Sequence, residues 1–305
     1  MAENAFTIVK KKENVSVKRK KIVEIIPKLL LSPTFVVMVV FIYGFIFWTI
    51  YISMTDSKLM PNYRFVGLEQ YLILFKEPRW WVAIKNLFIF SFLFVLLCVV
   101  SGLILAILLD QKIKGENVLL TIYLSPMAVS LIVTGVAWKW ILNPELGLER
   151  FMQQLGFINF KFRWLVDPNM AIYTVVIAAV WQATGYAMAL FLAGLRAIDN
   201  SLIEAAKVDG ANMFQIYTRV IIPSLKPAFL SCVVILTHIA IKTFDLVMAL
   251  TKGGPGYATD VPATFMYAFA FNRGRLALGA ASAVIMFIVV ISIIVPYLYI
   301  ARERR

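Results

Sequence analysis

The chain alternates long apolar stretches with short polar segments, a pattern typical of a protein that crosses a membrane several times. A hydrocarbon core of about 30 Å needs about 20 helical residues. Five runs of 22 to 28 residues contain no charged side chain, at 29–55, 86–109, 117–138, 168–195 and 276–301. Residues 227–250 contain a run of 15 uncharged residues followed by only two charges, Lys242 and Asp245, and they are interpreted as the remaining, sixth span, with polar groups inside the membrane. The sequence therefore predicts an all-α integral membrane protein with six transmembrane helices and both termini on one side.

Composition agrees with this pattern and excludes an ordinary soluble domain. Of the 305 residues, 61% are apolar and only 15% are charged, against about half and about a quarter in soluble domains. The net charge of +13 is not read as a nucleic-acid surface, because eight of the 30 Lys and Arg precede Pro33. Cys98 and Cys232 each lie inside an apolar stretch and are interpreted as small buried hydrophobes.

The distribution of Lys and Arg predicts the orientation. With the N-terminus inside, the inner segments carry 17 basic residues and the outer segments 11. By the positive-inside rule, both termini are expected in the cytoplasm. Residues 1–32 form a basic tail and residues 33–305 the transmembrane domain, with no cleavable signal peptide expected.

No loop is long enough to bury a core of its own, so no separate catalytic domain is expected. No Gly-Lys dipeptide occurs, which excludes a Walker A loop, and His238 with two scattered cysteines does not make a metal cluster. The glycines at 253, 254 and 256 surround Pro255 and are interpreted as a turn rather than a phosphate-binding loop. We therefore expect no nucleotide hydrolysis and no cofactor in this chain.

The longest inner loop, 196–226, is predicted to hold two short helices. Ser201 and Glu204 have the spacing of a capping box, which places a helix over 202–208 that ends at Gly210. Asn212 is positioned to cap a second helix, which Pro223 and Pro227 would end. Its apolar face is formed by Met213, Ile216, Tyr217, Val220 and Ile221. Such a hairpin either anchors the bundle at the membrane surface or docks a soluble partner.

This loop resembles the EAA loop of binding-protein-dependent ABC importer permeases. Glu204-Ala205-Ala206, three residues, Gly210, nine residues and 220–223 (VIIP) follow the family pattern EAA-x3-G-x9-I-x-L-P. The segments 181–209 and 244–267 are similar to the carbohydrate-uptake branch, which serves maltose, glycerol phosphate and multiple sugars. Lys252 stands where a third glycine is common.

The resemblance implies a type I ABC importer transmembrane domain in a bacterial-type plasma (inner) membrane. Its implied partners are a second homologous permease, two copies of a cytoplasmic ATPase that binds ATP and Mg, and an extracytoplasmic solute-binding protein with a carbohydrate solute. It also implies that the EAA helix sits in a groove of the ATPase and transmits its movements to spans that alternate between outward and inward openings. The implied coupling residues are Glu204, Ala205, Ala206, Asp209 and Gly210.

Polar residues inside the spans are the candidates for the solute path, because they are costly in lipid and tend to face the bundle interior. On the predicted fifth span, Ser231, His238, Lys242 and Asp245 fall on one helical face. His238 is the better candidate for a solute contact, whereas Lys242 and Asp245 are alternatively interpreted as a mutually neutralising pair, or as side chains that reach to the interface. The other candidates are Trp138, Trp181, Gln182 and Tyr186, although Trp and Tyr are also common as interfacial anchors.

Two other classes are weaker alternatives. An ion-coupled secondary transporter should show an internal repeat and carboxylates for ion coupling, and neither is evident. A membrane-embedded enzyme would need a nucleophile or a metal site among the spans, and the single histidine, His238, is weak evidence for either.

Overall fold

The computed structural model describes residues 30–111 and 113–303. The predicted basic tail lies outside the described residues except for its last three, which belong to the helix Leu30–Ser53. The chain divides into two units, Met1–Tyr51 and Ile52–Arg305, and each is described by itself. The described part of the first unit belongs to the apolar helix Leu30–Ser53, and the sites described below lie in the second unit.

Among the described residues, four helices are long and apolar enough to cross a membrane, and two bent helix pairs bring the total to as many as six. The four are Leu30–Ser53, α3 (Pro78–Asp110), α7 (Ala171–Arg196) and α14 (Leu276–Glu303). The described residues form helices and turns, apart from an isolated antiparallel bridge between Thr55 and Phe65. The all-α membrane fold predicted from the sequence is thus confirmed.

The third predicted span is broken rather than continuous. It consists of α4 (Glu116–Leu124), the 3-10 turn η1 (Ser125–Ala128) and α5 (Leu131–Ile141), with a bend of 99°. Pro126 lies in the turn, and the Ser130 hydroxyl accepts a hydrogen bond from the backbone N–H of Ile132, which starts α5.

The fifth predicted span is broken as well. α11 (Lys226–Ile241) ends before Lys242, and α12 (Asp245–Leu250) begins three residues later. Before it, α9 (Met213–Ile216), the π-type turn η2 (Tyr217–Ile221) and α10 (Ile222–Ser224) form a helix bent by 60° from α11. The bend lies between Pro223 and Pro227, where the sequence predicted that the helix ends before the fifth span. Pro223 itself occupies the first turn of α10, where proline is tolerated.

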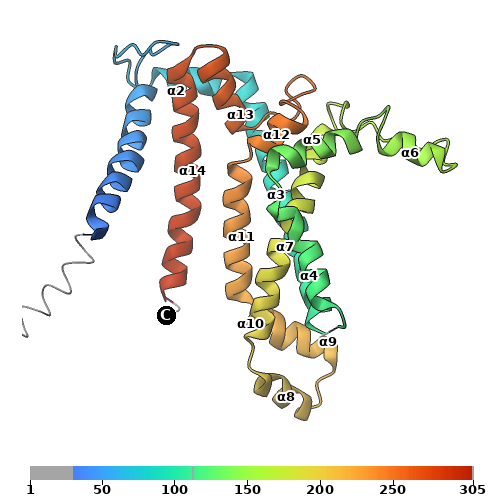
Figure 1. The fold of residues 1–305 in the computed structure, drawn as a ribbon. Coiled ribbons are helices and arrows are strands. Elements are labelled where there is room, and N and C mark those ends of the chain that lie inside the picture. Colours follow the sequence, from blue (N-terminus) through green and yellow to red (C-terminus); the bar gives the residue numbers. More distant parts are fainter. Residues whose placement is uncertain (1–29, 112, 304–305) are drawn as a thin grey trace, which may run out of the picture. The chain divides into compact units, whose positions relative to one another are not determined.

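The remaining elements of the described segments are α2 (Glu69–Lys76), α6 (Leu148–Gln154), α8 (Asn200–Val208), α13 (Pro262–Tyr267) and the π-type turn η3 (Ala268–Asn272). In Figure 1, α8 and α9 lie at the lower end of the bundle formed by α3, α7 and α11, whereas α2, α12 and α13 lie at its upper end. We call these the α8 end and the α2 end.

The core is built on close contact between α3 and α7. Phe90, Phe94 and Cys98 of α3 and Met188 and Phe191 of α7 are all fully buried in one cluster. Small residues permit this approach: a Cβ at Gly102 of α3 would lie 2.6 Å from the Cβ of Ala187 in α7. Packing in lipid depends on such small residues, since the hydrophobic effect does not drive helices together there.

Gly185 shows the same constraint against α4, and its replacement by alanine should destabilise the fold. A Cβ at Gly185 would lie 2.0 Å from the backbone oxygen of Tyr123, so one helix must move. Overpacking of this kind costs about 1–3 kcal/mol. We expect a lower thermal unfolding midpoint in detergent for Gly185→Ala. Gly44→Ala is the control, because a Cβ at Gly44 meets nothing within 4 Å and should leave the midpoint unchanged.

Candidate functional site

The first helix of the hairpin, α8, begins two residues earlier than the sequence predicted, at Asn200 rather than Leu202. Asp199 caps α8, and its Oδ1 accepts a hydrogen bond of 2.9 Å from the backbone N–H of Ser201. That bond lowers the pKa of Asp199. The predicted capping box of Ser201 and Glu204 is therefore wrong, because an aspartate two residues before Ser201 already provides the acceptor. Glu204 lies in the second turn of α8, where its side chain is exposed.

The end of α8 matches the prediction. Gly210 has φ +79°, and the N–H of Ala211 donates to the carbonyl of Ala206 at 3.0 Å, which closes the helix. Asn212 then caps α9 in a capping box with Gln215, with both hydrogen bonds at 2.9 Å. Two caps and a left-handed glycine thus fix the angle between the two helices.

The hairpin has a buried side and an exposed apolar side. Ile203 and Ala206 pack against the main core, as do Ile216 and Ile221, which are buried. Ala205 and Asp209 are exposed. The exposed apolar side chains are Leu202, Val208, Met213 and Phe214, and we call them the tip patch.

Sequence reasoning missed most of this patch. Met213 was expected to share one apolar face with Ile216 and Ile221, which are buried, but Met213 is 58% exposed, and Phe214 is 76% exposed. Val208 is 87% exposed at the end of α8. The sequence did contain a local indication of this patch. Val208 and Phe214 are apolar, but they do not belong to the helical repeat of apolar positions that pack against the core.

A cavity of about 440 Å³ lies where the fifth predicted span is broken. Five helices contribute to its wall: α3, α5, α7, α11 and α12. Its lining residues are Phe90, Phe94, Leu131, Ala179, Gln182, Ala183, His238, Ile239, Lys242, Thr243, Asp245 and Leu246. The structure thus brings together four of the predicted path residues: Gln182, His238, Lys242 and Asp245.

The other three predicted path residues do not line this cavity. Trp138 and Trp181 contact each other edge to face, with ring centroids 5.9 Å apart, and join α5 to α7. Tyr186 is partly buried against the main core. Phe90, Phe94 and Thr243 were missed: the phenylalanines stand in an unbroken apolar run, and Thr243 joins the wall because the helix breaks beside it.

The polar groups of the cavity have few partners inside the described part of the chain. Nε2 of Gln182 donates to the carbonyl of Val129 at 2.7 Å, at the break between η1 and α5. Nδ1 of His238 is buried and has no hydrogen-bond partner among the described residues. Lys242 and Asp245 are exposed residues that line the cavity, and no ion pair within 4.0 Å joins them.

The prediction of one polar helical face over Ser231, His238, Lys242 and Asp245 is therefore wrong beyond His238. α11 ends at Ile241, and the backbone turns away before Asp245 starts α12. Helix dipoles favour this placement, because Lys242 stands at the C-terminus of one helix and Asp245 in the first turn of the next. The dipoles therefore stabilise both charges without pairing them.

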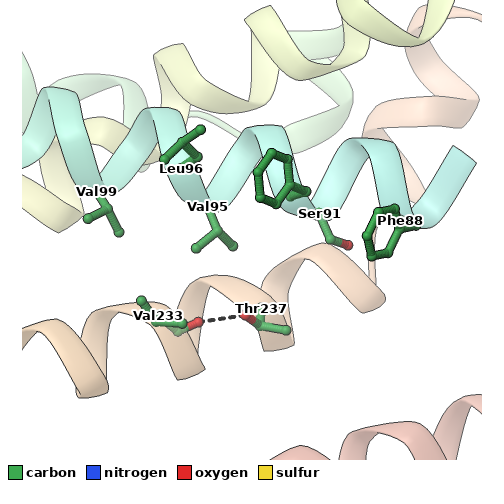
Figure 2. A pocket seen from close by; sticks show the side chains of 8 residues that line it. Phe88, Ser91, Val95, Leu96, Val99, Val233 and Thr237 are labelled. Atoms are coloured by element: carbon green, nitrogen blue, oxygen red, sulfur yellow. Dashed lines mark hydrogen bonds between the residues drawn. The ribbon is translucent and has the colours of Figure 1, made fainter.

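A second hollow lies on α3 and α11 outside this cavity and is almost wholly apolar. Figure 2 shows this groove, whose volume is about 390 Å³. Ser91 on α3 and Thr237 on α11 are its polar members, and the Thr237 hydroxyl donates to the carbonyl of Val233 at 2.7 Å. It contains none of the residues predicted for the solute path.

Comparison with known proteins agrees with this architecture. Two relatives match most of the chain. A probable ABC transporter permease protein of Pyrococcus horikoshii is 40% identical over 89% of this chain and 94% of its own length. A xylose/arabinose import permease protein of Haloferax volcanii is 38% identical over 87% of this chain and 84% of its own length. The fold is similar, with a TM-score of 0.76 and 23% identity over 90% and 94% of the two chains, to that of a bacterial ABC transporter involved in the import of the acidic polysaccharide alginate. Residues 98–305 match the family described as binding-protein-dependent transport system inner membrane component. The chain belongs to this family of ABC importer permeases.

Proposed function

We propose that this permease imports a sugar or sugar-like solute through the cavity beside α12. The observation that carries the proposal is the cavity itself, where an amide, an imidazole, an ammonium and a carboxylate face one space between apolar walls. Hydroxyl groups both donate and accept hydrogen bonds, so a polyol satisfies all four of these groups. The phenylalanine rings of α3 offer an apolar surface for a sugar ring.

Two of the relatives named above support this solute class. The Haloferax volcanii protein is named for xylose and arabinose, and the structural neighbour takes part in alginate import. Among sugars, a neutral pentose, an oligosaccharide and an acidic saccharide remain candidates for this chain.

The α8 end is proposed to face the cytoplasm and to bind an ATPase. The tip patch exposes four apolar side chains beside the carboxylates of Glu204 and Asp209, which suits a partner groove with apolar walls and a basic rim. The complete importer would contain a second related permease, two copies of the ATPase and an external solute-binding protein. ATP and Mg would bind to the ATPase, and this chain would be a non-catalytic subunit in a bacterial-type inner membrane.

The orientation has a direct test. A reporter active only outside the cytoplasm should work when fused after residue 155 or residue 258, and it should fail at residue 305. A signal from the fusion at residue 305 would contradict the placement of both termini in the cytoplasm.

The solute class is tested by uptake. Cells lacking this chain should lose uptake of one labelled saccharide from a panel of pentose, disaccharide and uronate oligosaccharide, and the restored chain should return it. Amino acid uptake serves as the control and should be unchanged. Unchanged uptake of every saccharide, or a loss confined to amino acids, would contradict the proposal.

A further inference from the structure

One buried ion pair at the α2 end lies outside the cavity. Nε of Arg79, at the start of α3, lies 2.6 Å from Oδ2 of Asp260, which precedes α13. The side chains are 13% and 1% exposed. The other carboxylate oxygen, Oδ1, accepts a hydrogen bond from the Thr264 hydroxyl. Both oxygens of Asp260 are therefore engaged, and they hold the loop 251–260 against α3.

Two further contacts attach the same loop to α3. Nδ2 of Asn86, two turns along α3 from Arg79, donates to the carbonyl of Asp260 at 2.9 Å and to that of Tyr257 at 3.3 Å. The guanidinium of Arg79 lies over the ring of Tyr257, 4.3 Å from its centroid. Burial of ionised groups seldom adds net stability over an apolar pair, so a buried ion pair at this place fits a role in fixing geometry.

The loop is stiff between this attachment and α12. The hydroxyls of Thr251 and Thr259 lie 2.6 Å apart, and Thr259 also donates to the carbonyl of Gly254 at 2.9 Å. Thr251 and Lys252 both donate backbone N–H groups to the carbonyl of Val247 in α12. Arg79 is thus linked to α12 by its bond to Asp260, by the peptide bond between Asp260 and Thr259, and by the hydrogen bonds from Thr259 to Thr251 and from Thr251 to Val247.

α12 is the element that carries Asp245 and Leu246 into the cavity wall. α12 also packs tightly on α5, because a Cβ at Gly135 would lie 2.5 Å from the Cβ of Ala249. A displacement of the loop 251–260 would therefore displace α12, and with it the part of the cavity wall that Asp245 and Leu246 form.

We propose that Arg79 and Asp260 are positioning residues for transport: their ion pair fixes α12 relative to α3, and so sets the geometry in which Asp245 and Thr243 meet the solute. The inference rests on the proposed function, because it assigns the solute to the cavity beside α12. The pair contacts no solute itself, and its effect passes through the loop 251–260.

The experiment compares variants in the complete importer, reconstituted in vesicles with its own partners. Arg79→Met strands a buried carboxylate and should lower the unfolding midpoint. The double variant Arg79→Met with Asp260→Asn removes that stranded charge, so its midpoint and its assembly should return to near the parent's. Its KM for uptake should nevertheless stay about 10-fold or more above the parent's, because the wall is misplaced.

Arg79→Lys gives a second measurement, which does not require that the double variant regain the stability and assembly of the parent. Lysine keeps the charge but lacks the planar group that lies over Tyr257, so KM should rise by a smaller factor at an unchanged midpoint. Arg163→Met is the matched control: Arg163 pairs with Glu149 at 3.6 Å, in a segment that does not touch the cavity, and should leave KM unchanged.

Two outcomes are separable. A parent and an Arg163→Met variant that take up no saccharide would contradict the proposed function. A working parent, together with a double variant that transports at the parent's KM once its stability has returned, would overturn the positioning role.

Discussion

Replacing Gly210 by valine should stop ATP-driven uptake while leaving the chain inserted and joined to its sister permease. Gly210 has φ +79°, a conformation that costs residues with a Cβ about 1–2 kcal/mol, and β-branched valine fits it worst. That cost is a factor of about 5–30 in the population of the native hairpin. No other atom lies within 4 Å of a Cβ at this position, so the effect comes from the backbone and not from a clash. Uptake and ATP hydrolysis by the reconstituted importer measure the result.

Gly210→Asn provides the matched control. Asparagine adopts the left-handed conformation more readily than other residues with a side chain, so uptake should be largely retained. If Gly210→Val also transports normally, with hydrolysis still coupled to uptake, the hairpin is only an anchor at the membrane surface.

Neighbouring positions refine this test. Ala206 is half-buried against the core, so a bulky side chain there would disturb the bundle itself, whereas Ala205 is exposed and reports on the partner alone. Asp199 is the cap, so Glu204→Gln changes a charge without removing the N-cap. A loss of ATPase binding in Glu204→Gln would therefore point to an ion pair with the partner.

Replacing either Lys242 or Asp245 by alanine should reduce uptake by about 10- to 100-fold. A hydrogen bond to a charged group is worth about 1.5–3 kcal/mol, and each of these groups lines the cavity without pairing with the other. The double replacement should therefore be at least as impaired as either single one. Initial uptake rates at several solute concentrations measure this.

The alternative of mutual neutralisation predicts the opposite order. If the two charges neutralise each other during transport, Lys242→Ala alone strands a carboxylate and should be worse than the double replacement. Thr237→Val is the control on α11, because Thr237 lines the apolar groove and not the cavity. Better uptake by the double variant than by Lys242→Ala would contradict the independent roles.

The number and character of the spans follow from the sequence because charge-free length is a strong physical constraint in a membrane. Where the helices break does not follow as directly. Pro126 sits at the break between α4 and α5, yet Pro296 lies inside α14, which continues past it. A proline frees a backbone group in both cases, and only the surrounding packing decides whether the chain turns there.

The candidate sites likewise divide into features that local sequence predicts and features that depend on how distant segments pack. Gly210 and Asn212 were predictable because a left-handed turn and a helix cap have local signatures. Asp199 was equally local, but Ser201 and Glu204 offered a competing cap with the standard spacing. Gln182 and Asp245 line one cavity because the helix breaks after Ile241, and the contact of Arg79 with Asp260 joins positions 181 residues apart. No pattern in one sequence specifies such distant pairs.

The central claim, that this chain is the pathway of an ATP-driven importer powered from its α8 end, has one direct measurement. The chain, a sister permease and the ATPase are reconstituted in vesicles, with the solute-binding protein and labelled saccharide placed at the α2 end. We predict accumulation only when ATP is supplied at the α8 end, and none in Gly210→Val vesicles. Accumulation driven by an ion gradient without ATP, or by ATP supplied only at the α2 end, would contradict the account.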